Sequence, residues 1–319
     1  MSDALGQSAE IELMCLLAPY LQAKSFVDVG AEKGAIASAL FQSGLVGTLF
    51  EPLPRHLPAL QALAQRYGGN VYPWAVADAD DTRQFHVATD AEGRELDYFH
   101  SLERIDGDAR FAHGKSFDVS CRSLASVMAE GLLPNKLGIL KIDTEGRDLS
   151  VLHGLGSLRP ELVVCEFFTE GLYDGWRDAH PLLAIEHMQK LGYTRYLAYK
   201  RVEGFDHCAM GPCGFLPRQW GNLVFFSDEL FSNATATIVG HLERAEAALI
   251  DQWLAISADR EAKESVIGQQ IDNEQRSFEH IALLNNVCAE RLSAIETLDA
   301  EVKRLREVAS STRLRRNEN

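Results

Sequence analysis

Short apolar runs alternate with helix-like patterns along the first part of the chain, and this alternation limits the folds open to it. Buried strands are expected at 25–30, 47–52, 70–78, 117–121, 137–143 and 161–167, with an edge hairpin strand at 82–88 and helices at 33–43, 54–67, 123–130, 147–154 and 181–191. Because strand–helix–strand units pair their strands in parallel, the pattern predicts an α/β fold with a doubly wound sheet. Two further runs, at 194–202 and 221–228, have no helix between them and predict an antiparallel pair at one sheet edge.

The C-terminal part has a different character, with no proline and only two glycines after residue 232. An apolar heptad series is formed by Ile281, Cys288, Ile295 and Val302, with Leu284, Leu298 and Leu305 three residues behind. Such a series is typical of a coiled coil. We therefore expect one domain at 1–232 and a helical coiled-coil segment at 233–319 for oligomerisation or docking. A homo-oligomer is favoured over a hairpin folded back at 257–268, because the second half has the more regular heptads.

Composition and charge exclude several classes of protein. Hydrophobic residues make up 46% of the chain and charged residues 24%, as in ordinary globular proteins. The net charge of −15 disfavours nucleic acid as a partner, and no apolar run reaches the ~18 residues of a membrane span. The six scattered cysteines indicate reduced thiols, and the N-terminus carries acids where a secretory signal carries bases. We therefore expect a cytoplasmic protein.

The run VDVGAEKG, residues 27–34, ends the first expected strand with an acid and enters a helix through two glycines. It lacks the full G-x-G-x-x-G of a dinucleotide-binding fold, and Asp28 precedes Gly30. A carboxylate in this place repels a pyrophosphate but accepts hydrogen bonds from the ammonium of an amino-acid-bearing ligand. Asp28, Gly30 and Gly34 are therefore candidate ligand-binding residues.

A second acid, Glu51, stands 21 residues after Gly30 at the end of the next strand, where it can hold the two hydroxyls of a ribose. A ligand with an amino acid at one end and a ribose in the middle is S-adenosylmethionine. In the run AVADADD, Asp78 or a neighbouring backbone group is the candidate for contact with the adenine edge. Each residue taken singly can equally be a turn, cap or solvated residue, but their order and spacing favour the cofactor.

Four segments carry a family resemblance: FVDVGAEKG, LFEP, LKIDTEGRDLSVLHGL and PELVVCEF. They resemble the successive motifs of the FkbM-type methyltransferases, and the resemblance extends from about residue 25 to 228. It implies an S-adenosylmethionine-dependent enzyme with a class I methyltransferase-like fold. It also implies O-methylation, often of a hydroxyl on a saccharide or another natural product. Glu32 departs from the family pattern, which has an asparagine at that position.

The run LGILKIDTEGRDL, residues 137–149, ends an expected strand in three acids. Asp143 is expected beside the transferring methyl and the cofactor, because neighbouring strands are about 4.8 Å apart. A hydroxyl is not ionised at neutral pH, so its attack on the methyl needs a base or a metal that lowers its pKa. Asp143 can act as the base, or it can bind a divalent metal with Glu145, which is the less favoured arrangement. Glu166, at the end of the next strand, can join either arrangement.

Several of these residues have a second interpretation. Glu145 fits the first turn of the following helix, where a carboxylate satisfies free N–H groups, and Asp148 is expected to be solvated. His180 is a candidate base, although a rim position without catalytic duty is the stronger expectation. Tyr173 and Trp176 can form a platform for a sugar ring.

Two other functions remain open. An interaction protein that kept the fold but lost catalysis would work through its coiled coil, and the presence of Asp28, Glu51 and Asp143 argues against it. A nicotinamide-dependent oxidoreductase is disfavoured by the acid before Gly30 and by the missing third glycine.

Overall fold

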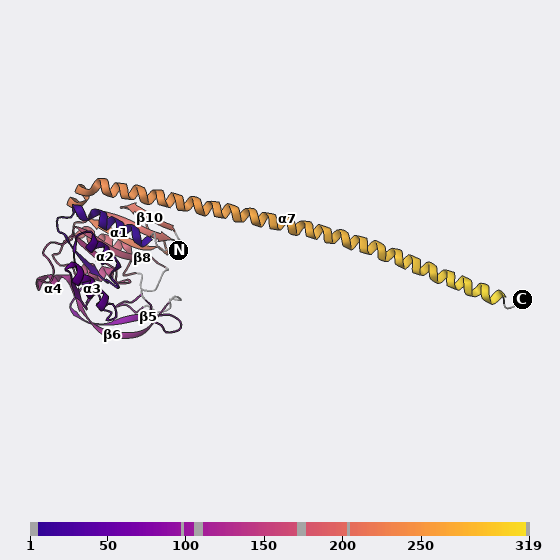
Figure 1. Cartoon of the computed structure of the whole chain (residues 1–319), viewed down its shortest axis with the longest axis horizontal. Coiled ribbons are helices and arrows are strands. Elements are labelled where there is room, and N and C mark those ends of the chain that lie inside the picture. Colours follow the sequence, from indigo (N-terminus) through magenta and orange to yellow (C-terminus); the bar gives the residue numbers. More distant parts are fainter. Residues whose placement is uncertain (1–5, 97–98, 105–110, 171–176, 203–204, 317–319) are drawn as a thin grey trace. The chain divides into compact units, whose positions relative to one another are not determined.

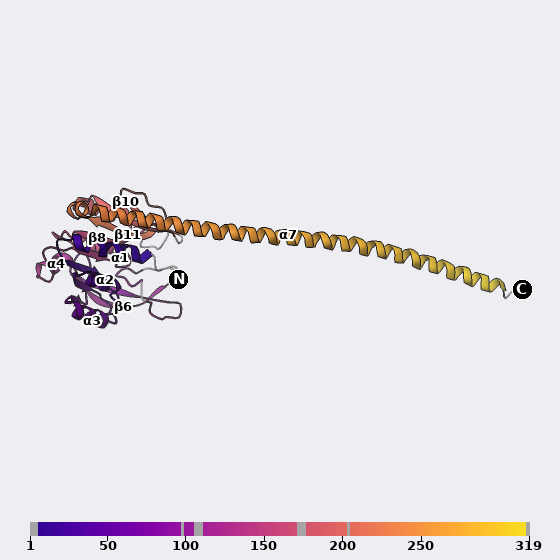
Figure 2. The same cartoon turned by 45° about the horizontal axis from the view of Figure 1, so that its top comes forward.

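The computed structural model describes residues 6–96, 99–104, 111–170, 177–202 and 205–316. It divides into two compact units, Met1–Asp251 and Gln252–Asn319, and each is described by itself. Figures 1 and 2 show the helices and strands of the first unit and the helix of the second. No helix in the described ranges is both long enough and apolar enough to cross a membrane.

The first unit is built on an eight-stranded sheet with the order β10-β9-β11-β8-β7-β1-β2-β3. The strands that pair in parallel are β1 (Ser25–Val29), β2 (Val46–Phe50), β3 (Asn70–Tyr72), β7 (Ile139–Ile142) and β8 (Leu162–Phe168). The strands that add antiparallel pairings are β9 (Arg195–Val202), β10 (Phe205–Met210) and β11 (Trp220–Phe226). The predicted parallel sheet with an antiparallel edge is therefore confirmed. The sequence did not predict β10, which carries polar residues at the outer edge.

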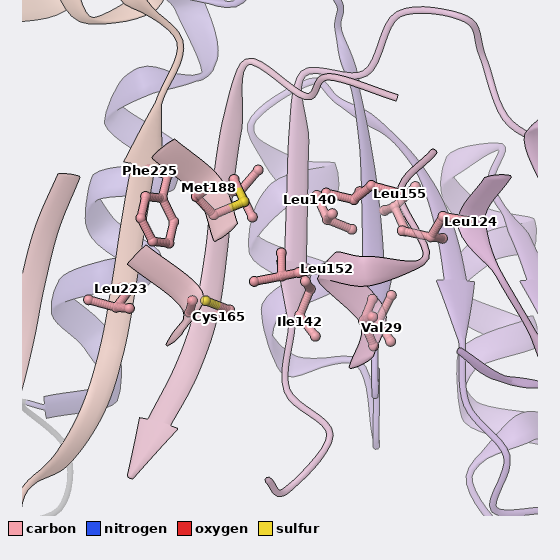
Figure 3. Close-up of a cluster of buried hydrophobic side chains, with 14 of the residues drawn as sticks. Val29, Leu124, Leu140, Ile142, Leu152, Leu155, Cys165, Met188, Leu223 and Phe225 are labelled. Atoms are coloured by element: carbon pink, nitrogen blue, oxygen red, sulfur yellow. The ribbon is translucent and has the colours of Figure 1, made fainter. Parts of the chain in front are cut away.

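Helices cover both faces of this sheet, as predicted. They are α1 (Gly6–Leu17), α2 (Ala35–Gln42), α3 (Leu57–Tyr67), α4 (Leu124–Ala129), α5 (Asp148–His153), α6 (Pro181–Lys190) and α7 (Asp228–Arg316). Residues of α4, α5 and α6 pack with one face of the strands in the cluster that Figure 3 shows. Residues of α1, α2, α3 and the first turns of α7 pack with the other face.

Strand β7 shows how the two faces alternate. Leu140 and Ile142 join the first cluster, whereas Ile139 joins the second. Because successive side chains of a strand point to opposite faces, Lys141 lies on the same face as Ile139, toward α1. The charged side chain of Lys141 is therefore buried on the side of the second cluster.

The strand expected at 70–78 is in fact two strands in two different sheets. β3 joins the large sheet, whereas β4 (Ala75–Val76) joins a three-stranded sheet of order β4-β6-β5. Pro73 separates them, because proline cannot donate to a strand ladder. β5 (Asp81–Thr89) and β6 (Ala112–Arg122) complete the small sheet, so the expected strand at 117–121 is not part of the large one. Figures 1 and 2 both show the small sheet on the opposite side of the unit from β10.

The first turns of α7 belong to the sheet unit. Ala234 and Ile238 are buried in the second cluster, and His241 accepts or donates a hydrogen bond of 2.6 Å with the Tyr199 hydroxyl. The two units divide at 251/252, beyond the boundary expected at 232. The composition changes near the residue where the helix begins, whereas contact with the sheet continues along the next turns.

Ending the chain after Ser232 should destabilise the first unit, whereas ending it after Asp251 should not. Removing one large buried aliphatic side chain such as Ile238 costs about 2–5 kcal/mol, so the shorter chain should unfold at a clearly lower urea concentration. Denaturant unfolding of the two truncated chains measures this difference. Equal midpoints would show that these turns add no stability.

Candidate active site

A cavity of about 190 Å³ lies at the carboxyl ends of β1, β2, β7 and β8. The strand order reverses here, because the chain continues from β1 to β2 on one side and returns to β7 on the other. Ligands bind at such switch points in open α/β sheets. The predicted site residues that line the cavity are Asp28, Gly30, Glu51, Asp143, Glu145 and Glu166.

Gly30 allows a tight turn after β1, next to the ends of β2 and β7. Its φ is +74°, and a Cβ atom at this position would lie 1.9 Å from the carbonyl oxygen of Asp143. Its N–H donates to the carbonyl of Phe50 at 3.0 Å, which ties the turn to β2. Gly34, with a φ of +82°, does not line the cavity; a Cβ atom there would meet Leu60 of α3. Gly34 therefore serves helix packing.

Lys141 lies buried between two of the predicted acids. Its Nζ is 3.1 Å from Oδ2 of Asp143 and 3.7 Å from Oδ1 of Asp28. Burial alone would lower the pKa of Lys141, but the carboxylates of Asp143 and Asp28 outweigh this effect and raise it. The sequence reasoning missed this residue, although a lysine inside an otherwise apolar strand was a usable signal.

The carboxylate of Asp28 is buried and accepts no hydrogen bond from the residues that the structure describes. Only 1% of the residue is exposed, and both side-chain oxygens lack a donor within the described ranges. Burial raises the pKa of Asp28 to about 6, although the nearby ammonium of Lys141 opposes this shift. A buried carboxylate is costly unless it is hydrogen-bonded, so this group suits a ligand that brings its own cationic donor. The ammonium of S-adenosylmethionine is such a donor.

Glu51 directly follows β2 and is held in place by backbone groups. Its Oε2 accepts from the N–H of Glu32 and its Oε1 from the N–H of Leu53, each at 2.8 Å. A carboxylate has about four lone-pair sites, so these bonds orient the group and leave capacity for two hydroxyls. The departure from the family pattern at Glu32 does not affect this contact, because the residue takes part through its backbone.

The expectation that Asp148 is solvated is wrong. The residue is 2% exposed, and its Oδ1 accepts from the N–H and the hydroxyl of Thr144 at 2.9 and 2.6 Å. Its Oδ2 accepts from the N–H of Glu166 at 2.6 Å. Asp148 is the first residue of α5, and its carboxylate points back toward the sheet. Through these hydrogen bonds it connects the loop after β7 with β8.

Glu145 and Glu166 lie beside Asp143 in the cavity wall. Oε1 of Glu145 accepts from the N–H of Phe99 at 3.1 Å, and the residue has a φ of +53°, so it does not cap the following helix. Burial and the charge of Asp143 raise the pKa of Glu145 to about 8. Burial and the charges of Asp143, Glu145 and Asp148 raise the pKa of Glu166 well above its usual range. These raised pKa values favour the protonated form of both carboxyls.

Asp78 lies outside the cavity lining. It accepts hydrogen bonds from the Ser150 hydroxyl at 2.7 Å and from Arg83 at 3.0 Å, and these bonds lower the pKa of Asp78 to about 2. The chain between β3 and β5 instead lines the cavity with Trp74 and Val76. The structure thus does not bring Asp78 together with the other candidates.

His180 is also absent from the lining of the cavity. It precedes α6, and its Nδ1 accepts from the N–H of Leu182 at 3.3 Å, which makes it the helix cap. Tyr173 and Trp176 lie outside the described residues. Within the described part of the chain, no group of three or more His, Cys, Asp or Glu side chains is arranged to hold a metal ion.

The end of the cavity farther from β1 contains polar residues that the sequence reasoning missed. Glu10 of α1, Arg201 of β9, and Trp220 and Asn222 of β11 line it. They are distant in sequence and belong to no common motif, so only the tertiary fold brings them together.

The model of the methyltransferase FkbM domain matches residues 28–195. A precorrin-6y C5,15-methyltransferase from Geobacter metallireducens GS-15 is similar at 9% identity, covering 68% of this chain and 88% of that chain with a TM-score of 0.34. An O-methyltransferase from Bacillus cereus in complex with SAH is similar at 9% identity, covering 71% and 84%, with a TM-score of 0.37. A 1,6-didemethyltoxoflavin-N1-methyltransferase from Burkholderia thailandensis is similar at 14% identity, covering 69% and 78%, with a TM-score of 0.34. A search of curated proteins gave no match.

The matched range begins at Asp28 and includes the loops that carry Gly30, Glu51, Asp143 and Glu145. It spans more than half of the 319 residues. The sheet has the class I methyltransferase-like arrangement, and the family implies S-adenosylmethionine as the methyl donor. The chain belongs to the FkbM methyltransferase family.

Proposed function

We propose that the protein transfers a methyl group from S-adenosylmethionine to a hydroxyl of a saccharide or a related natural product. The observation that supports this most is the position of Asp143. Its side chain is 38% exposed in the cavity, and its Oδ2 is anchored by Lys141. An acid that is both held and accessible is suited to take a proton from a substrate.

Asp28, Glu51 and the turn at Gly30 are the residues that would hold the donor. Asp28 would accept from the ammonium, and Glu51 would accept from the ribose hydroxyls. Gly30 keeps the turn free of a side chain where Asp143 and the ligand approach it. The bound S-adenosylmethionine supplies a methyl group on a sulfonium, which a hydroxyl oxygen can attack.

Asp143 would accept the hydroxyl proton as the new carbon–oxygen bond forms and the methyl–sulfur bond breaks, which leaves S-adenosylhomocysteine. Lys141 orients this carboxylate and places a positive charge between it and Asp28. Glu145 and Glu166, whose raised pKa values favour the protonated form, would donate hydrogen bonds to the acceptor. Glu145, with a pKa of about 8, would become a second proton acceptor in alkaline solution.

Replacing Asp143 with asparagine should lower kcat by at least ~100-fold, because the amide keeps the shape but cannot take the proton. Transfer of labelled methyl to a panel of saccharides measures turnover, and calorimetry measures cofactor binding. The affinity for S-adenosylmethionine should change much less than kcat. Full activity in Asp143→Asn would show that the residue is structural.

Asp118→Asn is the matched control, since Asp118 is an exposed acid of β6 outside the cavity lining, and its turnover should equal that of the wild type. Loss of wild-type turnover in EDTA would support the less favoured metal-assisted mechanism instead. Binding of S-adenosylmethionine without transfer to any acceptor would support the interaction-protein alternative.

We also propose that the second unit makes the protein a homo-oligomer through a coiled coil. Large apolar side chains are exposed along its helix, including Ile271 at 57%, Phe278 at 70% and Ile281 at 53%. Their spacings of seven and three residues are those of a coiled-coil seam. The helix is continuous through 257–268, so the alternative of a folded-back hairpin gains no support.

Light scattering should find an oligomer for the full chain and a monomer for the chain that ends at Asp251. Phe278→Glu in the full chain should also weaken association, because it places a charge in the apolar seam. Glu279→Gln, at the adjacent exposed position, is its control and should leave the mass unchanged. A monomeric full chain would rule out the intermolecular coiled coil.

A further inference from the structure

We infer that Glu10, Arg201, Trp220 and Asn222 form the acceptor subsite, and that this subsite selects an uncharged sugar ring over an anionic one. The inference rests on the proposed function, since it assigns a place and a chemical character to the acceptor of that reaction. These four residues line the same cavity as Asp28 and Asp143. They come from three different elements and none of them belongs to the proposed donor site.

The four side chains contact one another, and two of them, Glu10 and Arg201, are buried. Oε1 of Glu10 accepts from Nδ2 of Asn222 at 2.7 Å and from the guanidinium of Arg201 at 3.3 Å. Glu10 is 5% exposed and Arg201 8% exposed. The guanidinium carbon of Arg201 lies 4.5 Å from the centre of the Trp220 ring. Neighbouring groups thus hold each polar side chain in one orientation, as ligand recognition requires.

The strand register places this subsite beside the proposed base. Asn222 of β11 pairs with Glu166 of β8, and β8 is the neighbour of β7, after which Asp143 follows. Val164 and Val224 lie in the second cluster, so Glu166 and Asn222, each two residues away, lie on that same face. Two strand spacings, about 10 Å, separate β7 from β11. A ring held at Asn222 can therefore extend toward Asp143.

The two ends of the cavity differ in charge. At the donor end the carboxylates of Asp28, Glu51 and Asp143 lie close together around the ammonium of Lys141, which suits a cationic ligand. At the other end the carboxylate of Glu10 is paired with the guanidinium of Arg201.

This ion pair favours a neutral ligand. A sugar hydroxyl both donates and accepts, so it can bond to a carboxylate and a guanidinium at once. A carboxylate or phosphate ligand would compete for Arg201 and face the charge of Glu10 in a buried place, where an uncompensated charge is costly.

The test uses the full chain with S-adenosylhomocysteine present and methyl glycosides as probes. The methyl glycosides of glucose, galactose and mannose are the neutral probes. Each is compared with the methyl glycoside of the corresponding uronic acid, which has a carboxylate in place of the hydroxymethyl group. The wild type should bind at least one neutral glycoside at least about tenfold more tightly than its counterpart, measured by NMR titration. Glu10→Gln keeps the shape and removes a negative charge from beside Arg201, so the preference should shift toward the uronic acid by about tenfold or more.

Glu12→Gln is the matched control, since Glu12 lies on the same helix but is exposed and absent from the cavity lining. It should leave the preference unchanged. Arg201→Gln should shift the preference in the opposite direction from Glu10→Gln, which keeps the test decisive if either variant folds poorly. Calorimetric titration with S-adenosylmethionine reports whether each variant is folded.

The inference is overturned if the wild type binds no neutral glycoside, if it prefers the anionic partners, or if Glu10→Gln leaves the preference unchanged. Methyl transfer is assayed separately, which distinguishes the two claims. Selective binding without transfer would sustain the subsite and contradict the proposed function. Transfer to a hydroxyl with no change of selectivity in the variants would support the proposed function and contradict the subsite.

Discussion

The buried ammonium of Lys141, placed between Asp28 and Asp143, is the interaction on which the active site depends. In the parallel pairing of β1 and β7, Asp28 lies directly opposite Lys141. Burying an unpaired charge costs several kcal/mol, so neither residue would be tolerated inside the second core without the other. The same ammonium anchors Asp143 at the point where β7 ends. One cation therefore allows two acids to stand close together at the switch point of the sheet.

The cavity joins two regions with different electrostatics. Near β1 and β2 the acids outnumber the single buried lysine, and Asp28 lacks a hydrogen-bond donor among the described residues. Near β9 and β11 Glu10 and Arg201 form a buried ion pair. Between these two regions lie Glu145 and Glu166, whose raised pKa values favour the protonated form. A cationic donor and a neutral acceptor can thus meet at Asp143 without competing for the same groups.

Residues that end a regular element were predictable from the sequence, and residues placed by tertiary contacts were not. The alternation of runs predicted the parallel sheet. Asp28, Glu51 and Asp143 lie at or just after the ends of its strands and were expected to come together because strand ends share one sheet edge; all three line the cavity. Lys141 was missed because a strand pattern does not show which neighbour a polar side chain will face. Asp148 was misjudged because its burial depends on the direction in which α5 begins. Glu10 and Arg201 meet only through the folding of α1 over β9.

Calorimetric titration of S-adenosylmethionine into the full chain at several pH values tests the central claim most directly. A bound cation favours the ionised form of nearby acids, so Asp28, with a pKa of about 6, and Glu145, with a pKa of about 8, should lose protons when it binds. Affinity should therefore rise from about pH 5 to about pH 7, below the range in which the ligand's own amine loses its proton, and binding in this range should release protons, measured in buffers of different ionisation enthalpy. S-adenosylhomocysteine, which lacks the sulfonium charge, should bind more weakly and release fewer protons. Affinity that is independent of pH, with no proton release, would contradict the account.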